Sequence, residues 1–312
     1  MRSLERPALR LAFIATVVSL ALGASLRIQG ADRQLVLIAG RASHGAGEHE
    51  FRAGSLLFQK ALSGISGLTI RVYTNGWPSK VVDGKTVDDN AALDQADAVL
   101  IYADGGGGHP VVQRDHLAVI DSLAARGVGL GFAHYGVEVP AGVPGNAMFR
   151  WIGGYYEDRY SVNPMWAPAF TVFPGHPVTR GVQSFSNTDE WYFNMRWTTD
   201  TAAASRIVPL LTARPSDQVR QGPYVNPRGP YPHIVAASGA TEALMWAYER
   251  PDGGRGFGFT GGHTHKNWGN VNQRRVMLNA LLWISKVDVP ASGVIDRITE
   301  ADLAENLDPK PR

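Results

Sequence analysis

The chain has 312 residues, of which 44% are apolar and 19% are charged, so it can form a substantial core and does not have the composition of a disordered protein. The formal net charge is only +2 and no stripe of lysine and arginine stands out, which argues against a nucleic-acid partner. Cysteine is absent, and this excludes disulfide bonds, a thiol nucleophile, an iron–sulfur cluster, a thiolate zinc site and a lipoprotein anchor.

Residues 1–30 have the layout of a secretory signal peptide. Arg2, Arg6 and Arg10 form a basic start, the apolar run 11–23 follows, and small residues come after it. The apolar run is shorter than the roughly 18 residues that a membrane span needs. We therefore expect a periplasmic or secreted protein with no stable membrane insertion after signal removal. An uncleaved N-terminal anchor is the alternative.

Strands and helices are predicted to alternate over the first part of the mature chain. Apolar or alternating runs predict strands and helical spacing predicts helices. The predicted strands are Leu35–Gly40, Leu68–Thr74, Ala98–Ala103 and Val128–Ala133, and the predicted helices are Phe51–Ile65, Asp88–Ala96 and Asp115–Arg126. This alternation predicts an α/β fold with a doubly wound, mostly parallel sheet.

Residues 140–240 are less regular and rich in Pro, Gly, Trp and Tyr. We expect an irregular insertion here rather than a separate domain. Its strand candidates are Phe170–Phe173 and Ile207–Ala213.

The last part of the chain returns to regular structure. Ala243–Tyr248 and Gly256–Thr260 are predicted to be a pair of strands, and Gln273–Ile284 is predicted to be a helix. We expect a single domain over residues 31–295. The polar segment Asp296–Arg312 is expected to be a peripheral tail.

Six of the nine histidines fall in loops that follow predicted strands. In open α/β sheets, ligands bind beyond the carboxyl ends of the strands, so these histidines are candidates for one site. Each has a structural alternative, because a loop histidine often only bonds a backbone carbonyl. The six are His44, His49, His109, His134, His263 and His265.

The segment Ser43–Phe51 (SHGAGEHEF) combines His44 and His49 with Glu48 and Glu50. Imidazole and carboxylate groups close together can bind a metal or transfer a proton. The alternative is a helix start, since acidic residues suit the positive end of a helix.

The run Asp104–His109 (DGGGGH) places four glycines directly after a predicted strand. Glycines there let backbone N–H groups face a ligand, so we expect Asp104, His109 and the amides of Gly106, Gly107 and Gly108 to hold a substrate oxygen. A flexible turn is the alternative. The phosphate-loop and dinucleotide signatures are missing, and no nucleotide cofactor is expected.

His134 ends a predicted strand in the segment Gly131–Gly136 (GFAHYG). This is the strand–turn context of a nucleophile elbow, with histidine in place of serine or cysteine. Histidine there can act as an acid, a base or a metal ligand. A packed strand-end histidine is the alternative.

Two later motifs supply carboxylates and further histidines. Asp189 and Glu190 are adjacent, and because neighbours on a strand point to opposite faces, at most one of them should face a given pocket. His263 and His265 are two apart, a spacing that in an extended chain can chelate one metal, together with His134.

These segments together resemble the ThuA-like family, named for trehalose utilisation. The matching pieces are Ser43–Phe51, Asp104–His109, Gly131–Gly136, Asp189–Tyr192 and Gly254–Trp268. The resemblance implies the fold of class I glutamine amidotransferases, which is flavodoxin-like, and a role in the metabolism of disaccharides or keto-sugars. The amidotransferase cysteine corresponds to His134, so glutaminase chemistry is out of reach here. Some members of the family have been seen with a bound metal.

We therefore expect an exported enzyme that acts on a carbohydrate, a sugar or keto-sugar, by proton transfer or with a divalent metal such as zinc. His134, His44, Asp189 and Glu190 are the expected catalytic residues. The substrate would also contact His49, Trp191 and Trp268, because sugar rings pack on aromatic side chains. The alternatives are a metal-dependent glycoside or ester hydrolase and a carbohydrate-binding protein without catalysis.

Overall fold

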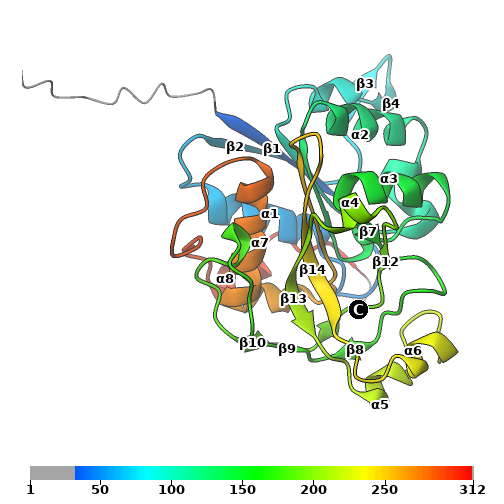
Figure 1. The fold of residues 1–312 in the computed structure, drawn as a ribbon. Helices are drawn as coiled ribbons and strands as arrows, with labels where there is room; N and C mark the ends of the chain where they lie inside the picture. Colours follow the sequence, from blue (N-terminus) through cyan, green and yellow to red (C-terminus); the bar gives the residue numbers. More distant parts are fainter. Residues whose placement is uncertain (1–31, 311–312) are drawn as a thin grey trace, which may run out of the picture. The chain divides into compact units, whose positions relative to one another are not determined.

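The computed structural model describes residues 32–310, and the expected signal peptide lies outside them. Its centre is a seven-stranded sheet in the order β13-β14-β15-β6-β5-β1-β2 (Figure 1). The five strands from β15 to β2 are parallel. At one edge β14 runs antiparallel to β15, and β13 runs antiparallel to β14. The strands are β1 (Arg33–Ala39), β2 (Leu68–Tyr73), β5 (Ala98–Tyr102), β6 (Gly129–Ala133), β13 (Ile207–Ala213), β14 (Glu242–Glu249) and β15 (Arg255–Phe259). The doubly wound, mostly parallel α/β sheet is therefore confirmed.

The central strands are buried on both faces, as their continuous apolar runs predict. All residues of β5 and β6 are buried, and so are the last five of β1. Glycine in β6 permits close packing, because a Cβ on Gly129 would lie 2.1 Å from the Ile284 carbonyl oxygen. The sheet is thus the rigid frame from whose carboxyl edge the loops emerge.

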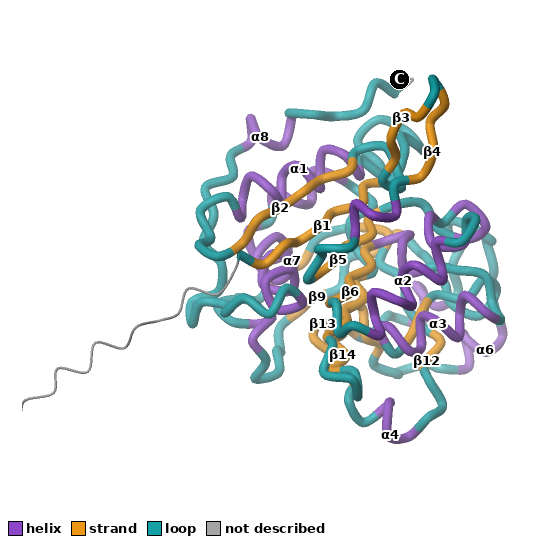
Figure 2. The backbone as a smooth tube through the Cα atoms, turned by 90° about the horizontal axis from the view of Figure 1, so that it is seen from above, coloured by secondary structure: helices purple, strands orange, loops and turns teal. Residues whose placement is uncertain are grey.

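Helices cover both faces of the sheet (Figures 1 and 2). On one face lie α1 (Phe51–Leu62) and α7 (Val271–Ile284), which pack against the alternate β1 side chains Leu35 and Leu37. On the other face lie α2 (His116–Ala125) and α3 (Val143–Ile152), whose buried residues belong to the same apolar cluster as Val36 and Ile38. This two-sided arrangement follows from alternating crossovers in a doubly wound fold.

Two predictions between residues 75 and 155 are wrong. The helix expected at Asp88–Ala96 shrinks to the 3₁₀ turn η1 (Asn90–Leu93), preceded by a hairpin of β3 (Ser79–Val82) and β4 (Lys85–Asp88). Asp83 and Gly84 both have positive φ, the usual Asp-Gly hairpin turn. The irregular segment expected to start at residue 140 begins instead with helix α3. Its proline does not break the helix, because it lies in the first turn, where proline is tolerated.

The insertion after α3 consists of short elements, as expected. Strand β13 covers the predicted residues, whereas the strand expected at Phe170–Phe173 is only two residues long. The elements are β7 (Gly154–Tyr155), β8 (Met165–Trp166), β9 (Ala169–Phe170), β10 (Phe185–Ser186), β11 (Asp189–Glu190), β12 (Arg196–Trp197), α4 (Thr201–Ala204), α5 (Asp217–Arg220) and α6 (Pro232–Ala236).

The C-terminal segment packs more closely than the expected peripheral tail. Asp296 is buried and forms an ion pair of 2.8 Å with Arg274 of α7. After α8 (Glu300–Ala304), the buried Lys310 ammonium lies 3.3 Å from Glu50, at the start of α1. Buried charges need such partners, and these hold the segment on the domain. Within residues 32–310, the helices are too short or too polar to span a bilayer.

Candidate functional site

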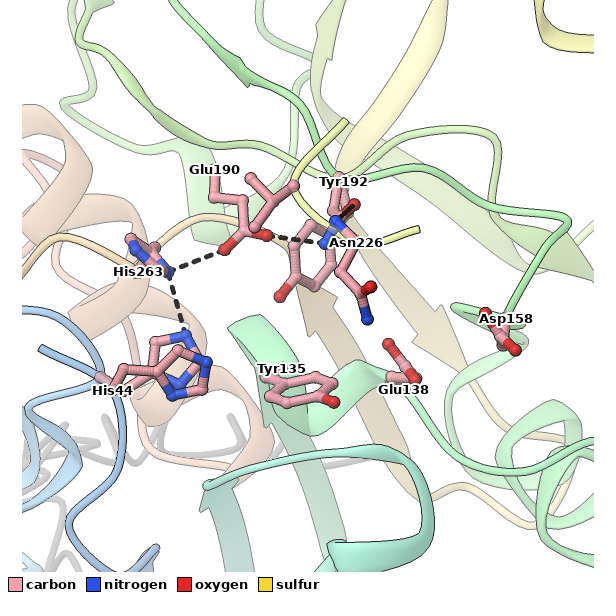
Figure 3. Close-up of a pocket in the computed structure, with 11 residues that line it drawn as sticks. His44, Tyr135, Glu138, Asp158, Glu190, Tyr192, Asn226 and His263 are labelled. Atoms are coloured by element: carbon pink, nitrogen blue, oxygen red, sulfur yellow. Dashed lines mark hydrogen bonds and ion pairs between the residues drawn. The ribbon is translucent and has the colours of Figure 1, made fainter. Parts of the chain in front are cut away.

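Four buried side chains meet at the carboxyl edge of the sheet. His49 comes from the loop after β1, His134 follows β6, His263 follows β15, and Glu190 lies on β11 of the insertion. Figure 3 shows Glu190 reaching toward His263 at one side of a pocket. Three of the six candidate histidines named from the sequence therefore lie side by side.

The potential ligand atoms of the four side chains are close together. His49 Nε2 lies 3.0 Å from His134 Nε2 and 3.0 Å from His263 Nδ1. Glu190 Oε2 lies 2.7 Å from His263 Nδ1 and 3.6 Å from His134 Nε2. All four atoms lie within 4.8 Å of one another, so this cluster could hold a metal ion.

The outer contacts of His134 and His49 fix where their protons are. His134 Nδ1 lies 3.1 Å from the Thr260 carbonyl oxygen, which only accepts, so Nδ1 donates and Nε2 keeps its lone pair. His49 Nδ1 lies 3.0 Å from an Asp104 carboxylate oxygen, and the same reasoning applies. Both Nε2 lone pairs therefore point inward. The Tyr192 hydroxyl lies 3.3 Å from His134 Nε2 and His263 Nδ1 lies 3.0 Å from His49 Nε2, so each lone pair can accept a hydrogen bond or bind a metal ion. A carboxylate or carbonyl behind a histidine is the usual support of a metal-bound imidazole.

The turn that carries His134 is as strained as a nucleophile elbow requires. His134 has φ of 52°, a conformation that a residue with a Cβ rarely adopts. The chain then turns tightly, and a Cβ on Gly136 would lie 2.8 Å from the Ile101 carbonyl oxygen. The predicted strand–turn context of His134 is therefore confirmed, and it aims the imidazole into the cluster.

The electrostatics keep two of the histidines neutral. Burial lowers the pKa of His49 to about 2 and the pKa of His134 well below its ordinary value, and nearby histidines add to both effects. For His263 burial is the largest single effect and lowers the pKa, but the hydrogen bond to Glu190 together with the negative charges of Glu190, Asp189 and Glu48 outweighs it, so the pKa is raised. Neutral imidazoles are the form that binds metals, so His49 and His134 need lose no proton to do so.

A small cavity of about 110 Å³ opens above the cluster. Its wall opposite Glu190 carries Glu138 and Asp158 (Figure 3). Burial and the nearby carboxylates of Asp158 and Glu190 raise the pKa of Glu138 to about 8. Its carboxylate makes no side-chain hydrogen bond or ion pair within residues 32–310. Glu138 was not among the site residues expected from the sequence. Its position four residues after His134, at the end of the same turn, would have suggested that it lies near the cluster.

Asp189 and Glu190 have different roles, as their adjacency predicted. Glu190 faces the cluster, and its other oxygen accepts a 2.7 Å hydrogen bond from Asn163. Asp189 faces away and accepts hydrogen bonds from the amides of Gly262 (2.8 Å) and Thr264 (3.0 Å). Asp189 therefore shapes the loop that carries His263 and is not positioned for catalysis.

His44 lies beside the cluster without joining it. Its ring contacts the His49 ring with centroids 3.6 Å apart and a tilt of 34°, and its side chain is 40% exposed at the pocket. Burial lowers the pKa of His44, partly offset by Asp104. His44 is therefore placed to contact a ligand in the pocket.

Several predicted site residues lie elsewhere. His109 is fully buried: Nε2 lies 2.9 Å from the Gly136 carbonyl oxygen, and Nδ1 accepts from the Val111 amide. His265 is turned toward the Leu303 carbonyl oxygen at 3.1 Å and does not reach the cluster. Both histidines support loops, because both ring nitrogens of His109 and the Nε2 of His265 bond to backbone groups.

The predicted aromatic and glycine contacts also differ from expectation. The rings of Trp191 and Trp268 are 0% exposed, so neither presents a face to a sugar. The Gly106 amide donates to the Glu138 carbonyl and the Gly108 amide donates to the Gly105 carbonyl. With these amides already paired, they cannot form the expected oxyanion site. Gly107 and Gly108 instead line a separate hollow, which also borders Asp104.

Comparison with known proteins identifies similar sequences and folds. The family model ThuA, described as trehalose utilisation, matches residues 43–284. A ThuA-like protein from Bacteroides uniformis has a TM-score of 0.56 at 16% identity over 83% of this chain and 94% of its own. One from Parabacteroides merdae has a TM-score of 0.55 at 14% identity over 87% and 99%. No curated protein matches the chain.

Proposed function

Because the chain belongs to the ThuA family, we propose that it is an enzyme that acts on a sugar or keto-sugar at a divalent metal centre. His49, His134, His263 and Glu190 would hold the ion. The observation that carries the proposal is the pair of inward lone pairs on His49 and His134, fixed by Asp104 and the Thr260 carbonyl. This arrangement fits a zinc-like ion, which prefers imidazole and carboxylate ligands.

Glu138 is the residue best placed to move a proton. It faces the cluster across the cavity, and its raised pKa of about 8 suits a group that exchanges protons near neutral pH. A bound divalent ion would polarise a carbonyl or hydroxyl oxygen of the substrate. The C–H group next to a sugar ketone is acidic, so Glu138 would take that proton and return it at a neighbouring atom.

The remaining pocket wall suits a polyhydroxylated ligand. Asn226 and Asp158 offer hydrogen-bond donors and acceptors around the cavity, and Tyr135 presents its ring beside Glu138 (Figure 3). Burial raises the pKa of Tyr135 to about 12, so its hydroxyl stays a donor. Small-molecule sites use a few polar groups of this kind to orient a ligand.

Export is part of the same proposal. The basic residues and the apolar run at 1–30 support a cleaved signal peptide and a periplasmic or secreted protein. Mass spectrometry of the protein from the periplasmic fraction tests this point. A mature N-terminus between about residues 21 and 30 supports it, and an intact Met1 or an exclusively cytoplasmic protein contradicts it.

Metal content by elemental analysis tests the central claim. The protein is purified without a histidine tag, alongside His134→Ala and His263→Ala. The matched control is His233→Ala, which removes an exposed histidine outside the cluster. We expect about one metal per chain in the wild type and the control, and loss of the metal in the two cluster variants. Absence of metal after loading with zinc, manganese and iron would sink the metal centre.

Turnover separates the enzyme from a sugar-binding protein. Glu138→Gln should keep the metal and bind the ligand but lose proton transfer to a 3-keto-disaccharide. Wild-type protein that binds metal and sugar without any turnover of keto-sugars would favour the binding role.

A further inference from the structure

A second hollow, of about 620 Å³, lies beyond the carboxyl ends of β1, β2 and β5. In the sheet β1 lies between β2 and β5, so the chain leaves this point in opposite directions. Such a switch point is where open α/β sheets bind ligands. The histidine cluster lies on the other side of Asp104. It shares the loop after β1 with the hollow, through His49, but its other members come from β6, β15 and β11.

Two glycines on the wall of this hollow have no structural need to be glycine. Gly107 and Gly108 are exposed, and neither has a positive φ. A Cβ on either would meet no atom within 4 Å. Because both residues line the hollow, a side chain there would occupy it, so the glycines keep the hollow open.

An indole ring is also held in place in the lining of the hollow. Trp77 is half-buried and stacks on His116 with ring centroids 3.8 Å apart and an interplanar angle of 5°. His116 in turn bonds the Pro110 carbonyl (2.7 Å) and the Asp88 carboxylate (2.8 Å), and the indole N–H donates to Asn90 (2.8 Å). A ring fixed in this way offers an apolar surface at little entropic cost.

The charges around the hollow are balanced. Arg41 and Arg114 are matched by Asp88 and Asp104, and Arg114 forms a 2.6 Å ion pair with Asp88. Arg41 has no carboxylate partner within residues 32–310. The inner oxygen of Asp104 bonds His49 and Ser43, which leaves its other oxygen unpartnered among those residues. Mixed donors and acceptors beside an aromatic ring suit a neutral polyhydroxyl ligand better than a phosphate.

We propose that this hollow binds a neutral sugar ring between Trp77 and the Gly107–Gly108 backbone, with Arg41 and Asp104 as hydrogen-bond partners. Asp104 also supports His49, so the hollow and the metal centre share a wall. One saccharide would occupy both, with the reacting ring at the metal and a second ring in the hollow. The inference rests on the proposed function and adds to it a second sugar subsite outside the histidine cluster.

Isothermal titration with trehalose, maltose and glucose tests the second subsite. At least one disaccharide should bind the full-length, metal-loaded protein about tenfold or more tightly than glucose does. Gly107→Leu should remove this preference and leave glucose affinity unchanged, because it fills the hollow only. Gly64→Leu is the matched control, since Gly64 is also an exposed glycine with no atom within 4 Å of a Cβ and no positive φ.

Three results would overturn the inference. They are equal affinities for glucose and both disaccharides, a disaccharide preference that survives Gly107→Leu, and binding of glucose 6-phosphate through Arg41 in place of the neutral sugars. Metal content of the same preparations keeps the two proposals apart. A metal-free protein whose disaccharide preference depends on Gly107 would refute the metal centre alone, whereas a metal-loaded protein without the preference would refute the subsite alone.

Discussion

Acid should destabilise the protein partly through His109, the buried histidine beneath the His134 turn. Its Nε2 lies 2.9 Å from the Gly136 carbonyl oxygen and its Nδ1 accepts from the Val111 amide, so the folded state holds one defined neutral tautomer. Protonation of Nδ1 would remove the lone pair that accepts the Val111 N–H and would bring two N–H groups into conflict. Burial lowers the pKa of His109 from 6.5 to about 4, against a smaller opposite effect of the Gly136 hydrogen bond.

The size of the effect follows from this difference. Between pH 6.5 and 4 the unfolded chain binds a proton at His109 that the folded chain does not, so stability falls as the pH falls through this window. One pKa unit corresponds to about 1.36 kcal/mol. At pH 5, about one and a half units below the unfolded value, the loss is about 2 kcal/mol, and at pH 7 it is close to zero.

The substitution His109→Asn isolates this contribution. Asparagine can still accept from the Val111 amide at the start of the turn, but it does not titrate. The free energy of unfolding is measured in urea at pH 7 and pH 5, with a chelator present so that metal binding does not contribute. Wild-type protein should lose about 2 kcal/mol more than the variant between the two pH values. Equal losses would refute the structural role of His109 and reopen the substrate-binding role expected from sequence.

Three further predictions concern the site and its support. Asp104→Asn should weaken metal affinity by about tenfold, measured in competition with a chelator. This is the low end of the usual loss for a residue that supports a metal ligand, because Asp104 is partly exposed; the control Asp94→Asn, at an exposed site, should leave the affinity unchanged. Glu138→Gln should reduce kcat by about 10²-fold or more with the metal retained, and should abolish any limb of the pH profile near pH 8. Arg274→Ala should cost about 3–5 kcal/mol in the free energy of unfolding, because it leaves Asp296 buried and uncompensated. A change below about 1 kcal/mol would contradict that burial.

The sheet was predictable because its strands carry the signal in their own residues. The runs at Leu35–Gly40, Ala98–Ala103 and Val128–Ala133 are continuous and apolar, the pattern of strands covered on both faces. Helix α3 was not predictable in this way, since Pro144 and Gly145 suggest a turn and only packing against the sheet makes them helical. Tertiary contacts override local preference there.

The site was predictable only in part for a similar reason. That histidines at strand ends should converge follows from topology, and it placed His49, His134 and His263 correctly. Which of two nearby residues faces inward depends on loop geometry that spacing does not encode. His263 and His265 were expected to act together, but the chain enters the 3₁₀ turn η6 (His265–Gly269) between them, and the extended spacing is lost.

The strain at His134 and the cluster around it have a common explanation. A positive φ outside glycine costs about 1–3 kcal/mol, and the two inward Nε2 atoms lie only 3.0 Å apart. The surroundings nevertheless enforce both features, through the Thr260 carbonyl, the Asp104 carboxylate and His109 beneath the turn. Structures that break local rules and are held in place on every side are expected where function requires them. The proposed metal ion would use both lone pairs as ligands, which would explain why the surroundings hold His49 and His134 in this arrangement.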